Sequence, residues 1–166
     1  MIQNLTIAHW QHSKKKAELI SDSETLIEME FSRKATLVKM GKQKFEITKD
    51  GFWCPKILIT EKEKIVTLQK QLGLWGTKSG FVLDEQTYTA KTKQGTLFNI
   101  TYSNSTGDIL TYKLDTLKSK PKITFEIKSY DISEKHLLLL LALGFYSIKN
   151  VAVEAMENDF IVTAVA

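Results

Sequence analysis

The segment from Leu137 to Ile148 has no polar face. Eleven of its twelve residues are apolar or glycine, and Ser147 is the exception. A helix that is apolar all the way round has no side for solvent and must be enclosed. A membrane-spanning helix needs about 20 apolar residues, and this run ends after twelve, at Lys149 and Asn150. We therefore predict that a protein core surrounds the segment.

The residues just before this run are typical of a helix start. Ser133 is a suitable N-cap, and Glu134 follows it at the positive end of the helix dipole. Ile132 and Leu137 are placed to form a hydrophobic staple. We predict a helix near residues 133–149, whose core positions are Leu137, Leu138, Leu140, Leu141, Phe145 and Ile148.

Most of the chain before the helix has a different pattern. Between about residue 25 and residue 129 the apolar residues recur with period two, which is typical of strands with one buried face. Val66 and Leu68 flank Thr67, for example, and we expect the apolar pair to face the core. Short turn signals, such as Asp84-Glu85, separate these runs at intervals of about 9–14 residues. This spacing indicates an antiparallel meander with one polar face.

The strand pattern and the apolar helix are compatible in one architecture. A helix with its side chains is about 10 Å across, and an eight-stranded barrel is already filled by its own side chains. About ten or eleven candidate strands precede the helix, which is enough to surround it. We predict a closed or nearly closed antiparallel β-barrel around the helix. The alternative is a β-sandwich or an open sheet with the helix packed on one face.

No linker, low-complexity tract or repeat divides the chain. We expect an N-terminal extension over residues 1–20 and a single domain over residues 21–166. Residues 151–166 leave two interpretations open. Their first half extends the helix or begins a strand, and the apolar end from Phe160 is a last strand or a docking tail.

One stretch of the sequence resembles a known family. Lys- and Thr-rich hairpins are followed by the strand ITFEIKSYDIS and the helix EKHLLLLLALGFYSI. This order resembles the tubby C-terminal-like superfamily, which includes the phospholipid scramblases and the LURP-one-related proteins. The resemblance implies a mainly β fold, a barrel of about twelve antiparallel strands around a hydrophobic C-terminal helix. It also implies contact with anionic phospholipid, whereas calcium binding is not expected because Glu126 is the only acid in residues 123–130.

Charge and cysteine content exclude several classes of protein. The net charge is +4, and Arg33 is the only arginine among 23 basic residues. Because arginine is the residue that reads bases and phosphates with a planar fork, sequence-specific nucleic-acid binding is not expected. Cys54 is the only cysteine, so we expect neither an internal disulfide nor a thiolate metal cluster. The first twenty residues lack the pattern of a signal peptide, and we expect a cytoplasmic protein.

The lysines are unevenly distributed. Residues 34–70 contain nine lysines and four acids, whereas residues 131–166 contain two lysines and five acids. Such an excess is typical of a face that contacts anionic lipid headgroups, and equally of lysines that keep exposed strands soluble. The candidate lipid contacts are Lys39, Lys42, Lys44, Lys118, Lys120 and Lys122.

Other polar residues do not form a catalytic pattern. His9 and His12 would share a face only on a helix, and no third metal ligand follows them. We interpret His136 as a rim residue at the helix start, and Asp84-Glu85 as a solvated turn. We expect no catalytic residue, no cofactor and no metal.

The leading hypothesis is therefore a non-enzymatic tubby-like barrel that binds anionic phospholipid headgroups weakly, as a monomer or weak oligomer. A second hypothesis is a structural or partner-binding module that uses the apolar tail from Phe160. A third is an enzyme with a site at the barrel mouth, near Trp75 and His136.

Overall fold

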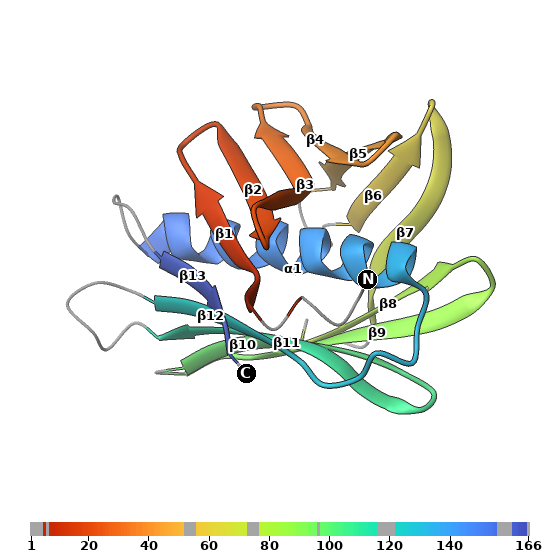
Figure 1. Ribbon diagram of the computed structural model, residues 1–166. Helices are drawn as coiled ribbons and strands as arrows, with labels where there is room; N and C mark the ends of the chain where they lie inside the picture. The colour runs from red at the N-terminus through yellow and green to blue at the C-terminus, as the bar shows by residue number, and fades with distance from the viewer. Residues whose placement is uncertain are drawn as a thin grey trace.

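The computed structural model describes residues 5, 7–51, 56–72, 77–95, 97–115, 122–155 and 161–165, without the side chains of residues 153–155 and 161–163. Strands lie above and below one long helix (Figure 1). The elements are β1 (His9–His12), β2 (Lys16–Ser21), β3 (Glu24–Phe31), β4 (Thr36–Met40), β5 (Gln43–Asp50), β6 (Lys56–Glu61), β7 (Lys64–Leu72), β8 (Lys78–Leu83), β9 (Gln86–Lys93), β10 (Leu97–Asn104), β11 (Gly107–Asp115), β12 (Lys122–Ile127), α1 (Glu134–Ala155) and β13 (Ile161–Ala164).

The strands pair with their neighbours in a ring. Each strand from β1 to β12 is antiparallel to the next, and β13 lies parallel to β12. The ring closes where β13 pairs with β1, through the register pairs His9↔Thr163 and Trp10↔Val162. Among the antiparallel strand pairs described, β1 and β13 share the fewest register pairs. The predicted mainly β, antiparallel fold with one C-terminal helix is confirmed.

Three hairpins are connected by two-residue turns in which both residues have positive φ. These turns are Asp22-Ser23, Lys62-Glu63 and Asp84-Glu85, with φ between 43° and 68°. Positive φ at both positions is what a type I′ turn requires, and its twist matches the twist of the strands that it joins. The turns therefore fix the strand register without glycine.

Helix α1 is enclosed, as its apolar sequence predicts. Leu137, Leu140 and Leu141 are completely buried, as are Phe145 and Ile148. Leu138 differs from the prediction because it is only half-buried. The helix contacts β11, β10 and β3, and it continues past the predicted end at residue 149 to Ala155.

Aromatic residues fix the helix against the strands. Trp10 stacks on Phe145, with ring centroids 4.2 Å apart, and its Nε1 donates a hydrogen bond to the Tyr112 hydroxyl at 3.0 Å. That hydroxyl in turn donates to the Leu141 carbonyl of the helix at 2.8 Å. Burial raises the pKa of Tyr112 well above its usual value, so the phenol stays protonated and can donate. Gly144 lies against the Tyr112 ring, where no Cβ would fit.

Lys149 is a charged residue inside this packed region. Its side chain is buried, with Nζ 3.2 Å from the centroid of the Phe31 ring. Nζ also donates to the Lys14 carbonyl at 3.5 Å. Burial lowers the pKa of Lys149 to about 8. The residue that ends the apolar run of the sequence is thus buried, although it is not apolar.

Most of the described N-terminal residues form strands of the sheet. Residues 1–20 were expected as an extension outside the domain, yet they contain β1 and most of β2. Trp10 is the buried residue of β1, between His9 and the exposed Gln11, and it stacks on Phe145 of the helix. The His12 ring, on the same face as Trp10, lies 6.1 Å from the Phe145 ring between centroids. A four-residue strand is too short to show a period-two pattern clearly, which explains the difference.

Strand β7 shows a second difference from the predicted pattern. Thr67 is buried, opposite the buried Ile59, whereas Leu68 lies opposite Leu58 on the outer face. The prediction that Leu68 faces the core is wrong. The register between β6 and β7 shifts between Ile59 and Thr60, and the extra residue of a bulge reverses which side chains face inward.

Candidate functional site

A basic groove lies on the outer wall of β8 and β9. It has a volume of about 630 Å³ and is lined by Thr77, Lys78, Lys91, Thr92, Lys93 and Gln94. Lys78 and Lys91 are direct partners in the antiparallel register of β8 and β9. Lys93 follows two residues after Lys91 on the same side of β9, and all three lysines are exposed. We call Lys78, Lys91 and Lys93 the lysine triad.

The lysine triad has no acidic counterpart among the residues that the structure describes. The ion pairs found in that part of the chain use other lysines, such as Lys39 and Lys113. Like charges directly opposite each other on a sheet are destabilising. An anion between Lys78 and Lys91 would relieve this repulsion, so the groove is suited to bind phosphate or a similar anion.

Two of the lysines singled out from the sequence, Lys39 and Lys44, are direct register partners in β4 and β5, but the described lysines of that set are not gathered at one site. Lys39 lies in β4 within 3.7 Å of Glu28 and 3.6 Å of Glu30, so its charge is largely neutralised. Lys42 and Lys44 are exposed on the β4–β5 hairpin. Lys122 begins β12, opposite Asp115, and Figure 1 shows this strand on the other side of the helix from β4 and β5. Lys118 and Lys120 lie outside the described residues.

Sequence reasoning missed the lysine triad, although a signal for it was available. Asp84-Glu85 is recognisable as a turn. A two-residue hairpin turn fixes the register, because residues at equal distances before and after the turn are paired. Leu83 pairs with Gln86, and the same register pairs Lys78 with Lys91. Counting lysines by segment could not find this, because the two residues lie in different strands.

A second polar cluster joins the helix start to the β8–β9 hairpin. His136 Nε2 lies 3.0 Å from Asp84 Oδ2, and His136 Nδ1 lies 2.7 Å from the Tyr88 hydroxyl. Lys135 Nζ donates to the same Asp84 oxygen at 3.3 Å. The Ser133 hydroxyl caps the helix by accepting from the His136 backbone N–H at 3.2 Å.

This cluster changes two interpretations of the sequence. His136 is a buried residue with only 4% of its surface exposed, so it is not a rim residue. Asp84 is not simply solvated, because hydrogen bonds from His136 and then Lys135 lower the pKa of its carboxyl group. The charged carboxylate is therefore stabilised, and its evident role is to tether the helix start to the β8–β9 turn.

The remaining candidate residues are separated in the fold or lie outside the described residues. His9 and His12 lie on strand β1, where a spacing of three puts them on opposite faces. No group of three or more potential metal ligands is present in the described part of the chain. Trp75, Cys54 and Phe160 lie outside the described residues, whereas Ile161–Ala164 forms β13 between β1 and β12.

The long helix does not have the composition of a membrane span. Within the described ranges, no helix combines the length and apolar character that crossing a bilayer requires. Comparisons of the chain with protein-family models, curated proteins and solved structures found no match.

Proposed function

We propose that this protein is a non-enzymatic, tubby-like barrel of the cytoplasm that binds anionic phospholipid headgroups through the lysine triad. The observation that carries the proposal is the register pairing of Lys78 with Lys91 beside Lys93, in a groove without an ion-paired acid among the described residues. The resemblance to the tubby C-terminal-like superfamily supports the same class of ligand.

Lysine suits this task better than it suits base recognition. Its ammonium group is a compact point charge that can bind a phosphate oxygen from many directions. Each lysine near an anionic membrane contributes about 1 kcal/mol at low salt, so the triad can contribute about 3 kcal/mol, or about a hundredfold in affinity. These charges are exposed, and salt should weaken the interaction.

The enclosed helix suits contact with the membrane surface rather than insertion. Its apolar residues are buried against the barrel strands, so they are not available to lipid. Binding would therefore use the outer wall of β8 and β9 and leave the fold unchanged. We infer weak, reversible attachment that depends on the lipid charge.

Co-sedimentation with liposomes tests the proposal. Vesicles of phosphatidylcholine alone are compared with vesicles that also contain phosphatidylserine, at low and at physiological salt. The test variant replaces Lys78, Lys91 and Lys93 by Gln. The matched control replaces Lys39, Lys42 and Lys44 by Gln, because it removes the same charge from another hairpin.

We expect the wild-type protein to bind only the anionic vesicles, and more strongly at low salt. The variant of the lysine triad should lose this binding, while the control variant keeps most of it. Equal loss in both variants would mean that only net charge matters, and it would contradict the proposed site. Absence of binding at both salt concentrations would refute the lipid function. If inorganic phosphate at millimolar concentration displaces the vesicles, the groove recognises the phosphate group itself.

A further inference from the structure

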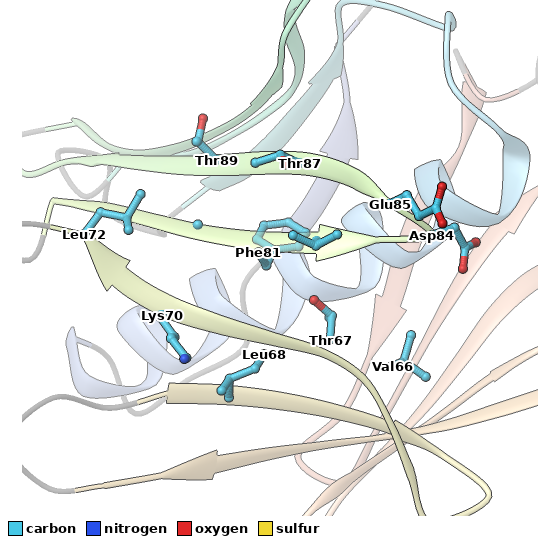
Figure 2. A pocket seen from close by; sticks show the side chains of 12 residues that line it. Val66, Thr67, Leu68, Lys70, Leu72, Phe81, Asp84, Glu85, Thr87 and Thr89 are labelled. Carbon is cyan, nitrogen blue, oxygen red and sulfur yellow. The ribbon is translucent and has the colours of Figure 1, made fainter.

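Strands β7 and β8 are paired along only part of their length. The register joins Lys70, Gln71 and Leu72 to Gly80, Ser79 and Lys78, and it stops there. Beyond this point the two strands diverge (Figure 2). Residues 64–69 of β7 pair with β6 on one side only, and residues 81–83 of β8 pair with β9 on one side only. Both strands thus present an open edge of backbone N–H and C=O groups, which is a template for another strand.

A second groove, of about 640 Å³, lies over this divergence. Its walls include the apolar side chains of Leu68, Leu72 and Val82, and the last two are 46% and 49% exposed. Phe81 and Thr67 also line it and are themselves buried. Two of the exposed large apolar side chains of the described residues, Leu72 and Val82, thus lie side by side with Leu68 at one groove. Such a local patch is typical of a surface that contacts a partner.

One wall residue of this groove has an unsatisfied polar atom. Thr67 is only 4% exposed, and its Oγ1 has no hydrogen-bond partner among the described residues. In Figure 2 the Thr67 side chain rises from β7 toward the open space below β8. The neighbouring Gln69 Oε1 is also buried without a partner, although its Nε2 donates to Ser79 Oγ at 2.6 Å. A buried polar atom without a partner is destabilising, so this site favours a ligand with hydrogen-bonding groups.

The groove has opposite charges at its two ends. Lys70 lines it near the paired end of β7 and β8, and Glu85 lines it at the diverging end, beside Asp84, which is already ion-paired with Lys135. A segment that ran antiparallel to β7 would have its N-terminal end near Lys70. Charge complementarity therefore favours an acidic residue at that end and a basic residue at the other.

We propose that the β7–β8 groove binds an extended peptide segment, which adds as a strand to the open edge of β7. The segment has apolar side chains at alternate positions, an acid near its N-terminal end and a base near its C-terminal end. An apolar groove could also hold the acyl chain of a lipid. A peptide strand is the better ligand here, because its backbone pairs with the open edge groups of β7, which an acyl chain would leave unpaired. The site and its ligand differ from those of the lysine triad, so each proposal can be tested and refuted independently of the other.

A model peptide tests the proposal. The probe is the blocked heptapeptide Glu-Val-Thr-Val-Thr-Val-Lys, added to ¹⁵N-labelled protein while amide shifts and hydrogen exchange are recorded. Control peptides exchange the two terminal charges or replace the central Val by Pro, which cannot donate to a ladder. Sodium decanoate below its micellar concentration represents the acyl chain.

Two protein variants control for the site. Val82→Lys places a charge in the groove, while Ile65→Lys changes an apolar residue of β7 that is 69% exposed and does not line the groove. We expect the probe to shift and protect the amides of residues 64–69, with binding weakened about tenfold by Val82→Lys and less than about twofold by Ile65→Lys. The Pro peptide should not bind, and the charge-exchanged peptide should bind more weakly.

Each other outcome overturns the proposal. No amide shift in residues 64–69 with the probe at about 2 mM would exclude strand addition. The dissociation constant would then lie above the millimolar range, which is too weak for a docked segment. Equal binding of the Pro peptide would mean that the backbone edge is not used. Saturable binding of decanoate in the groove, without any effect of the peptide, would assign the groove to an acyl chain.

Discussion

Gly144→Ala should destabilise this protein, although the same change usually stabilises a helix. Alanine is favoured over glycine inside a helix by about 1 kcal/mol. At this position, however, the new Cβ would overlap the Cδ2 and Cε2 atoms of Tyr112 and lie 3.3 Å from Cε2 of Tyr102. The Tyr112 ring cannot easily move, because its hydroxyl bonds both Trp10 and the Leu141 carbonyl.

The expected net effect follows from these two opposing contributions. Overpacking of a buried site costs about 1–3 kcal/mol, and a fixed ring belongs at the upper end of that range. Subtracting the helix preference leaves a loss of about 2 kcal/mol in the free energy of unfolding. For a chain of this size, that loss corresponds to a Tm lower by about 4–8 °C.

Urea denaturation, followed by circular dichroism and by tryptophan fluorescence, measures this change. Asn150→Ala is the control on the same helix, since Asn150 is exposed and its side chain hydrogen-bonds only Tyr146 among the described partners, and its effect should stay within about 1 kcal/mol. If Gly144→Ala were as stable as the wild type, the helix could not pack on Tyr112 as described.

Three further predictions concern buried or tethered groups. Lys149→Met should raise the free energy of unfolding at pH 7 by about 1–2 kcal/mol, because it removes a charge from a buried position. This value is smaller than the full pKa shift implies, because solvent screens the charge and the Phe31 ring attracts it. Because the pKa of Lys149 is lowered to about 8 from 10.5, the unfolded chain holds a proton that the folded chain releases between these values. The free energy of unfolding of the wild type should thus rise from pH 8 to 10.5 relative to that of the variant. Parallel urea titrations of the two proteins that show no such difference would contradict the lowered pKa of Lys149. Asp84→Asn should lower the urea midpoint at pH 7, and the difference should vanish as pH falls below 3.8 through the lowered pKa of Asp84; Glu85→Gln at the adjacent exposed position should change little. Leu140→Asp should prevent folding, since it buries an unpaired charge; a soluble variant with a cooperative melting curve would show that the helix is not enclosed.

The parts of the fold that follow from local pattern were predictable from the sequence. An all-round apolar helix has to be buried wherever it occurs, and the turn at Asp84-Glu85 is recognisable from its neighbours. What depends on register was not predictable in the same way. The register shift between β6 and β7 turns Thr67 toward the core and Leu68 toward the outside. The sequence of a single strand does not show where its partner slips by one residue.

Long-range pairing limited the prediction of the site for the same reason. His136 meets Asp84 and Tyr88 only because the helix start lies over the β8–β9 hairpin, about fifty residues earlier in the chain. The lysine triad depends on register across a turn rather than on the density of lysines along the chain. The open edges of β7 and β8 are invisible in the sequence, because each strand has the ordinary alternation of a paired one.

The seam between β1 and β13 has a consequence for the order of folding. It joins Trp10 to Val162, residues from nearly opposite ends of the chain, and such distant contacts form slowly since a long loop must close first. The hairpins, in contrast, join neighbouring strands and can form early. Closure at the seam should therefore be a late kinetic step, reached only after the helix has been surrounded. Because Trp10 stacks on Phe145 at this place, its fluorescence should change in that last phase, after most of the β-sheet signal has developed.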